Sequence, residues 1–329
     1  MVPAIVKGEK RMLMEDSGAG RVWRMREADT LTGKDAGRIL RMPTGTDDKY
    51  SRGVLGVRTG STAYPGAAVL GVEAAWRTGL GMVRYLGPGR AQNLILARRP
   101  ETVTAEGRVQ AWLIGSGTDA ADRSASEDEA LRSILSGDLP VVVDAGALDL
   151  AHVGAAPRIL TPHAREHDRL RETLGLSPVG RGASDPERED AARETAAALG
   201  AALLLKGSTT IVATPSGWTR RVKTGSPWLA TAGTGDVLAG VIGAIVAGAT
   251  AGEGSTAGVE ALGALGATGA WVHGRASSVA ALGHGASGGP ITALDVAEAL
   301  PGIVAGIVAG VVAGAVASGP SQGTHTGAA

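Results

Sequence analysis

The stretch TGSPWLATAGTGDVLAGVIGAIVAGA, residues 224–249, joins a turn of small residues to a long apolar run. At its centre, Gly233-Thr234-Gly235-Asp236 precedes large apolar residues that recur at helical spacing, namely Val237, Leu238, Val241, Ile242, Ile245 and Val246. A helix that begins in such a turn presents unpaired backbone N–H groups and the positive end of its dipole, and both attract anions. Asp236 is therefore either a helix cap or a base beside a bound phosphate, and this stretch alone leaves both open.

The composition narrows the class of protein. The chain has 329 residues with 32 basic and 32 acidic side chains, so its formal net charge is zero. This length accommodates one large α/β domain or two small ones. A balanced charge argues against a nucleic-acid-binding protein, which normally has a basic surface. The absence of cysteine excludes disulfides and thiol catalysis and leaves histidines and carboxylates as candidate metal ligands.

The two ends of the chain differ from its middle. Residues 1–20 hold no continuous apolar segment after their basic residues, so we expect no secretory signal and a cytoplasmic location. Over 1–48 we expect a leader and a short helical segment, which Arg26, Glu27, Asp29 and Lys34 suit. Over 302–329 we expect a Gly/Ala-rich, low-complexity tail. It is about as long as a marginal membrane span but poorly hydrophobic, so a membrane anchor is only the alternative.

Two glycine-rich loops each follow an apolar strand. The strand over 54–57 leads into a small-residue loop and then a helix carrying Ala67, without the lysine that closes a P-loop. This is either an ordinary strand–helix turn or a place where a ligand lies against the backbone. The strand over 111–114 runs into Gly115-Ser116-Gly117-Thr118-Asp119-Ala120, which matches a dinucleotide-binding fingerprint. Because a lone match is common in so glycine-rich a chain, we favour a second ligand-facing loop of the same sheet.

Charged residues close two further apolar strands. Asp144 lies at the end of the strand over 139–145, where open α/β sheets place their sites. Lys206 ends the strand over 201–207, where it either holds a phosphate or extends along the sheet rim towards water. Between them, Thr161 as N-cap and Pro162 at the first helical position predict a helix start. Beyond them we expect a helix over 184–198, a hairpin over 208–222 and two helices over 258–274 and 276–281.

Residues 163–167, HAREH, match the H-x-x-E-H pattern of some zinc proteases. Histidines four apart share one helical face, as a metal site requires. A third ligand and an apolar supporting helix are also needed, but the following residues are heavily charged. We therefore interpret His163 as a ligand-facing residue at a strand end and His167 as a solvated helix residue.

Taken in order, these segments resemble the ADP-dependent (S)-NAD(P)H-hydrate dehydratase family of the ribokinase-like superfamily. The resemblance runs over 49–301 and implies one three-layer α/β domain, with a mostly parallel central sheet and helices on both faces. No single segment is decisive, but six in the right order are specific. They are KYSRGVLGV with GSTAYPGAAVL, WLIGSGTD, VVVDAGALDL, ILTPHAREHDRL, LLLKGSTTIV and the opening stretch.

The resemblance implies a coenzyme-repair lyase. Its substrate is hydrated NADH or NADPH, which carries an extra ring hydroxyl. ADP, or ATP in its place, donates phosphate to that hydroxyl, and loss of phosphate restores the double bond. Mg²⁺ is expected with the nucleotide. The family implies a homo-oligomer, a tetramer, and neither nucleic acid nor membrane as partner.

The resemblance also implies residue roles. Asp236 is the expected base and contacts the hydrate together with Ala67, Gly117 and His163. The nucleotide is expected to contact Lys206, Gly207, Ser208, Thr209, Thr210 and Gly235. Metal ligands are not assigned, and Glu166 is a candidate only for a contact with the metal through water.

Four positions depart from the family's pattern: Ser116 where proline is usual, Asp149 where asparagine is common, Arg165 in place of a small residue, and Trp228-Leu229 in place of Gly-Met. They leave the reaction class intact and the fit of the substrate open. Two alternatives remain, a small-molecule kinase of the same superfamily and a nucleotide sensor without activity.

Overall fold

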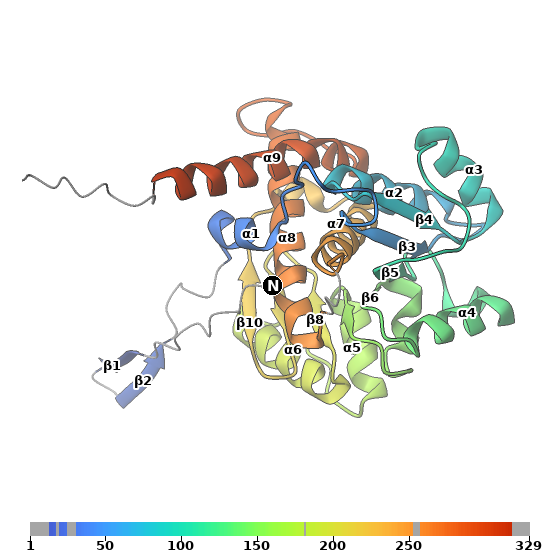
Figure 1. Ribbon diagram of the computed structural model, residues 1–329. Helices are drawn as coiled ribbons and strands as arrows, with labels where there is room; N and C mark the ends of the chain where they lie inside the picture. The colour runs from blue at the N-terminus through green and yellow to red at the C-terminus, as the bar shows by residue number, and fades with distance from the viewer. Residues whose placement is uncertain (1–12, 18–19, 25–30, 181, 253–256, 318–329) are drawn as a thin grey trace, which may run out of the picture.

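The computed structural model describes residues 13–17, 20–24, 31–180, 182–252 and 257–317. Its main body is an α/β fold built on one eight-stranded sheet (Figure 1). Within the expected leader, β1 (Leu13–Ser17) and β2 (Gly20–Arg24) pair as an antiparallel hairpin. The expected helical residues Arg26, Glu27 and Asp29 lie outside the described residues, and helix α1 spans Gly33–Ile39.

The large sheet has the strand order β10-β9-β8-β7-β6-β5-β3-β4. The six neighbouring strands from β8 to β4 run parallel, and β9 and β10 add an antiparallel hairpin at one edge. The strands are β3 (Val54–Arg58), β4 (Met82–Tyr85), β5 (Ala111–Ile114), β6 (Val141–Val143), β7 (Arg158–Leu160), β8 (Ala202–Leu205), β9 (Thr210–Ala213) and β10 (Thr219–Val222). Outside these strands, Val103 forms a single bridge to Arg84.

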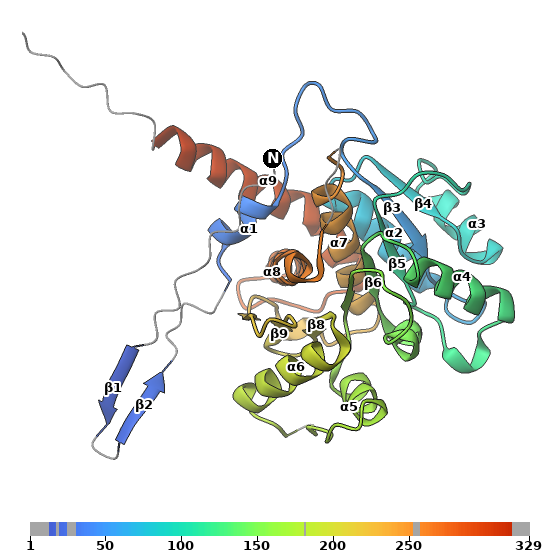
Figure 2. The same cartoon turned by 60° about the horizontal axis from the view of Figure 1, so that its bottom comes forward.

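Helices cover both faces of this sheet, as Figure 2 shows for the helices on either side of β8. One layer holds α1, α2 (Pro65–Thr78), α3 (Gly89–Arg98), α7 (Thr234–Ala249), α8 (Val259–Leu282) and α9 (Ala293–Ala317). The other layer holds α4 (Ala125–Leu135), α5 (Ala164–Thr173) and α6 (Asp185–Leu199). The three-layer α/β arrangement expected from the sequence is therefore confirmed.

The strands divide their side chains between two hydrophobic cores. Successive residues of a strand point to opposite faces, so a strand buried on both faces is continuously apolar. In β8, Leu204 belongs to the core under α7 and α8, while Leu203 and Leu205 belong to the core under α6. The sheet is thus fixed from both sides, and the carboxyl ends of its strands become a rigid platform.

Helix α7 is buried over most of its length. Its apolar residues line it on almost every side, and they pack against α2, α8 and the strands β3 and β5. Glycines permit these close approaches. A Cβ at Gly243 would lie 2.9 Å from Leu55, and one at Gly269 of α8 would lie 2.6 Å from Ile242. The start of α7 is therefore held in place by the core.

One expectation about the C-terminal third was wrong. The helices expected over 258–274 and 276–281 are the single helix α8, which contains no proline to end it. Helix α9 continues through Pro301 and so includes the first part of the low-complexity segment that starts at residue 302. An internal proline costs about 3 kcal/mol. Burial of apolar side chains offsets that cost at about 1.5–3 kcal/mol each, and in α9 Val296, Leu300 and Ile307 are buried.

No helix in the described part of the chain is both long and apolar enough to cross a membrane.

Candidate active site

Four adjacent strands deliver polar side chains to one edge of the sheet. Ser116 follows β5, Asp144 follows β6, Thr161 follows β7 and Lys206 follows β8. Asp144 is the centre of this group. Its Oδ1 accepts hydrogen bonds from Thr161 Oγ1 at 2.7 Å and from Lys206 Nζ at 2.9 Å, and its Oδ2 accepts one from Ser116 Oγ at 2.8 Å.

The Asp144–Lys206 pair is ionised although it is buried. Asp144 is only 2% exposed. Burial alone would raise its pKa, but the Lys206 ammonium and the two hydroxyl donors overcome this and hold its pKa below the usual range. Burial likewise opposes the charge on Lys206, yet Asp144, Glu166 and Asp236 together raise its pKa. The platform therefore carries one fixed positive charge within reach of three carboxylates.

The glycine turn opens α7 above this platform. Gly233 is the N-cap with φ of +87°, a conformation that side chains disfavour, and a Cβ there would lie 2.5 Å from Leu70. Thr234 Oγ1 closes the turn by donating to the carbonyls of Leu229 at 2.9 Å and Thr231 at 3.0 Å. No side chain caps the helix. The first amides of α7 are thus available to an anion.

Asp236 has the environment of a base and not of a helix cap. Among the described residues it makes no capping hydrogen bond to the turn. Burial and the nearby Asp144 carboxylate raise the pKa of Asp236 to about 7, and Lys206 lowers it only in part. A carboxylate with a pKa near neutrality is a better proton acceptor than an ordinary aspartate.

Lys206 lies directly against the glycine turn. A Cβ built on Gly235 would lie 3.7 Å from Lys206 Nζ. The charge of Lys206 also acts on the pKa of Asp236. The structure thus brings Lys206, Gly235 and Asp236 together, although they come from β8 and α7.

The loop after Lys206 is fixed by helix α6. Arg188 Nη1 donates to the carbonyl of Thr209 at 3.0 Å, and its guanidinium occupies the space beside Gly207. Gly207 and Ser208 are exposed, and Thr210 is partly buried at the start of β9. Thr209 is buried, and its side chain hydrogen-bonds to Asp185. The hydroxyl of Thr209 therefore faces α6, unlike the open Ser208.

Ala67 and Gly117 meet where the two glycine-rich loops approach each other. Gly117 has φ of +66°, and a Cβ there would overlap the Cβ of Ala67 and lie 3.0 Å from the carbonyl of Tyr64. The Gly60 N–H donates to the carbonyl of Ser116 at 2.7 Å and ties the two loops together. Position 117 therefore requires glycine, and the first turn of α2 packs directly against the loop after β5.

His163 is the N-cap of α5, two positions after the Thr161 that the proline pattern predicts. Its Nδ1 accepts from the Glu166 N–H at 3.1 Å, and Glu166 Oε2 accepts from the His163 N–H at 2.7 Å, so the two residues form a capping box. The prediction of Thr161 as N-cap and Pro162 as first helical residue was wrong, because the Thr161 hydroxyl is bonded to Asp144.

The H-x-x-E-H pattern does not form a metal site. His167 is buried and not solvated as expected, and its Nε2 lies 3.0 Å from Thr195 Oγ1. Burial lowers the pKa of His167 to about 4, so the ring is neutral at pH 7. In the described parts of the chain, no group of three or more histidines and carboxylates could hold a metal ion.

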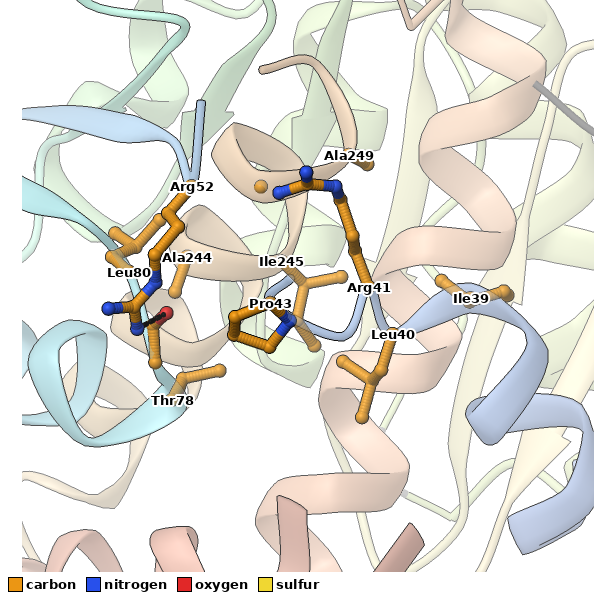
Figure 3. A pocket seen from close by; sticks show the side chains of 12 residues that line it. Ile39, Leu40, Arg41, Pro43, Arg52, Thr78, Leu80, Ala244, Ile245 and Ala249 are labelled. Carbon is orange, nitrogen blue, oxygen red and sulfur yellow. Dashed lines mark hydrogen bonds between the residues drawn. The ribbon is translucent and has the colours of Figure 1, made fainter. Parts of the chain in front are cut away.

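A small cavity elsewhere in the molecule is separate from this platform. It lies between the segment after α1 and the C-terminal part of α7, where Pro43, Arg52 and Ile245 are among its lining residues (Figure 3). Asp236 stands at the other end of α7, about 13 Å from Ile245 along the helix at 1.5 Å per residue.

The family assignment follows from a match over most of the chain. Residues 55–301 match the family model described as NAD(P)H-hydrate dehydratase. The chain belongs to this family. Among solved structures, the fold is similar to the ADP/ATP-dependent NAD(P)H-hydrate dehydratase of Bacillus subtilis, co-crystallised with ATP and Mg²⁺. That comparison has a TM-score of 0.71 and 26% identity and covers 84% of this chain and 98% of the other. The expected ribokinase-like fold is confirmed.

Two curated relatives place the chain within the dehydratase family. It is 44% identical over 218 residues to the bifunctional NAD(P)H-hydrate repair enzyme Nnr of Mycobacterium tuberculosis. This alignment covers 63% of the present chain and 43% of that protein. It is 34% identical over 250 residues to the ADP-dependent (S)-NAD(P)H-hydrate dehydratase of Neisseria meningitidis, in an alignment that covers 70% of the present chain and 78% of the Neisseria protein. The chain thus spans less than half the length of the bifunctional relative.

The sequence patterns missed one buried residue beside the candidate site. His273 of α8 is 7% exposed and hydrogen-bonds to the backbone of Thr234 in the glycine turn. Burial lowers its pKa to about 4, and its Nε2 has no partner among the described residues. On an apolar helix its position is that of an ordinary core residue. The sequence offered only one hint, the glycine that follows it at position 274. The structure shows that this glycine permits a close approach of α8 to the glycine-turn segment, because a Cβ there would lie 2.9 Å from the Gly225 nitrogen.

Proposed function

We propose that this chain dehydrates hydrated NADH or NADPH, the (S) form, with ADP or ATP as phosphate donor. The observation that carries the proposal is Asp236, a carboxylate with a pKa of about 7 in the first turn of an uncapped helix, next to the Gly235 that lies beside the Lys206 ammonium. A poised base, unpaired amides and a fixed cation are the three groups that phosphoryl transfer to a hydroxyl needs. The names of its relatives support the same reaction.

The proposed chemistry proceeds in two steps. Asp236 takes the proton of the ring hydroxyl while that oxygen bonds to the terminal phosphorus of the donor, and the phosphorus–oxygen bond to the rest of the donor breaks. The phosphate then leaves the ring with the electron pair of the carbon–oxygen bond, and loss of a proton from the neighbouring carbon restores the double bond. With ADP the products are the reduced coenzyme, AMP and phosphate.

The residues around Asp236 divide between the two ligands in this proposal. The amides of the glycine turn and Lys206 hold the phosphates, and Gly207 and Ser208 are exposed beside them. Thr209 and Thr210 shape the same loop. The hydrate lies over the close approach of Ala67 and Gly117, with His163 at the neighbouring strand end.

We assign Mg²⁺ to the nucleotide and not to a protein cage. In the described residues no cluster of three candidate ligands exists, and the Glu166 carboxylate is engaged as the cap partner of His163. Mg²⁺ is commonly held by substrate phosphates with one or two carboxylates, and it neutralises phosphate charge there. We assign no protein ligand to it, and no step above depends on one.

Incubation with hydrated NADH and ADP or ATP tests the reaction. Recovery of the absorbance of reduced nicotinamide supports dehydration. A phosphorylated product without that absorbance indicates the small-molecule kinase, and the absence of any turnover with intact nucleotide binding indicates the sensor. Comparing the two nucleotides also decides which donor is preferred.

The Asp236→Asn variant tests the catalytic assignment. We expect turnover to fall by roughly two to four orders of magnitude, because a general base contributes about that much. We expect nucleotide affinity, measured by calorimetry, to change little, because backbone amides and Lys206 hold the phosphates. Asp190→Asn on the exposed face of α6 is the matched control. Normal turnover by Asp236→Asn would remove Asp236 from the mechanism.

We further propose that the enzyme is a cytoplasmic homo-oligomer, a tetramer, whose catalytic unit is residues 49–301. The family match over 55–301 supports the catalytic unit, and the resemblance to the family supports the assembly. Light scattering of the purified chain tests the assembly directly, and a monomeric mass at assay concentration would contradict it.

A further inference from the structure

We propose that Asp144 is a positioning residue, whose carboxylate, itself held by Ser116 and Thr161, fixes the Lys206 ammonium against the glycine turn that carries Asp236. Asp144 has no part in the reaction proposed above, and the predicted site residues did not include it. The proposal gives it a task in catalysis without contact to the reacting atoms.

The geometry leaves Asp144 little freedom. Both of its carboxylate oxygens are occupied, Oδ1 by Thr161 and Lys206 and Oδ2 by Ser116, at 2.7–2.9 Å. The three partners come from the ends of three different strands, each packed into the sheet. Ser116 is one of the positions where this chain departs from the family's pattern, and its hydroxyl supplies one of these three bonds.

The position of Lys206 depends on that anchor. A lysine side chain is a flexible stem with a point charge, so its location is set by its partners. Asp144 is the carboxylate bonded to the ammonium, at 2.9 Å. With this bond made, the ammonium also lies beside Gly235. Without it, Lys206 is free to pair with Glu166 or Asp236, both of which already act on its charge.

Asp144 and Lys206 also act on Asp236 with opposite sign. The negative charge of Asp144 strengthens the hold of Asp236 on its proton, and Lys206 weakens it. The other charged or titratable groups near this pair are Glu166 at the start of α5 and His273 of α8, and both interact with Lys206. Removing Asp144 is therefore expected to lower the pKa of Asp236 for two reasons. The repulsion between the two carboxylates is lost, and the Lys206 ammonium is released to interact with Asp236.

The decisive experiment is a titration of Asp236 in the full chain, followed by carbon-13 NMR of its carboxyl group. The signal of Asp236 is the carboxyl signal that is missing from the spectrum of Asp236→Asn. In Asp144→Asn we expect the midpoint to move down by about one pH unit or more. The Ser116 hydroxyl can accept a hydrogen bond from the asparagine nitrogen while Thr161 keeps donating to the asparagine oxygen, so the fold is retained. In Lys206→Gln we expect the midpoint to move up. Asp190→Asn, on the exposed face of α6, is expected to leave it unchanged.

Opposite shifts in the two variants support the proposal, because simple structural damage would not change sign. An unchanged midpoint in a folded Asp144→Asn protein overturns it. If Asp144→Asn does not fold, Lys206→Gln still decides, since a midpoint that stays or falls contradicts the arrangement.

The kinetic part of the test rests on the proposed function. With hydrated NADH, Asp144→Asn is expected to lower kcat at pH 7 by about tenfold or more, since a displaced catalytic group has costs of this order. The acid limb of its pH profile should also move to lower pH. If the unmodified chain shows no dehydration, the proposed function fails, and the NMR titration still decides the role of Asp144.

Discussion

Asp236 combines partial burial with two charged neighbours of opposite sign. These raise its pKa to about 7, well above the ordinary value of 3.8. A carboxylate is a base only when it has lost its proton. The side chain therefore becomes able to accept a proton only as the pH rises through neutrality, and so would the base proposed above.

The first prediction at this scale concerns rate against pH. We expect kcat/KM to rise with pH, to reach half its maximum near pH 7, and to level off above it, because this parameter reports the free enzyme's essential groups. A pH–rate profile with hydrated NADH measures it. An acid limb near pH 4 would show either that the pKa of Asp236 is not raised or that Asp236 is not the base.

The second prediction concerns stability. Because the folded-state pKa of Asp236 lies above the unfolded value, the folded state holds the extra proton between about pH 4 and 7. The free energy of unfolding therefore falls as the pH rises through this window, by up to about 4 kcal/mol at about 1.4 kcal/mol per pKa unit. Asp236→Asn should be more stable than the unmodified chain at pH 8 and equally stable at pH 4. Urea unfolding at both pH values measures this, and equal stabilities at pH 8 would contradict it.

At the scale of elements, the site depends on how closely α2 approaches α7. A Cβ at Gly240 of α7 would overlap the carbonyl of Gly71 in α2 and lie 3.0 Å from Ala74. One turn nearer the start of α7, the carbonyl of Asp236 would lie 3.5 Å from a Cβ at Gly71 of α2. The backbone contact between the two helices thus sets where the glycine turn at the start of α7 lies.

Gly240→Ala tests this contact. We expect a loss of about 1–3 kcal/mol in the free energy of unfolding, because backbone cannot yield as a flexible side chain does. We also expect reduced turnover, because the helices must separate. The matched control is Gly306→Ala in α9, where the added methyl meets nothing within 4 Å and should stabilise by about 0.4–1 kcal/mol. Equal effects of the two substitutions would argue against a tight α2–α7 contact.

Sequence patterns predicted elements well where periodicity and local signals agree. The course of α7, the buried strands and the β9–β10 hairpin were all expected from runs of apolar residues and turn residues. The patterns failed at α5 and α8. Thr161 and Pro162 are a good local helix start, but Thr161 is committed to Asp144 on another strand. Such a commitment depends on strand order, which local spacing does not contain.

At the scale of the whole molecule, α9 ties the last part of the chain to the core. It contacts α1, α2, α7 and α8, and Ile307 is buried beyond the expected domain boundary at residue 301. The helical layer on this side of the sheet therefore includes residues from the segment expected to be a tail.

Ile307→Ala tests whether this stretch belongs to the folded domain. We expect it to lower the free energy of unfolding by about 2 kcal/mol, the lower end for truncating a buried isoleucine. The neighbouring exposed position, Gly306→Ala, serves again as control. Denaturant unfolding of both variants gives the answer, and an unchanged midpoint for Ile307→Ala would return residues after 301 to the status of a tail.

The amino-acid sequence by itself determined the alternation of strands and helices, the glycine turn before α7 and the placing of Asp144 and Lys206 at strand ends, because these follow from periodicity and from the preferences of glycine. The three-layer arrangement was expected from the resemblance to the family. Only the tertiary structure decided what those residues do. Asp144 and Lys206 are 62 positions apart, and their pairing, like the raised pKa of Asp236, arises from burial and distance. Both quantities exist only once the strands have taken their order in the sheet.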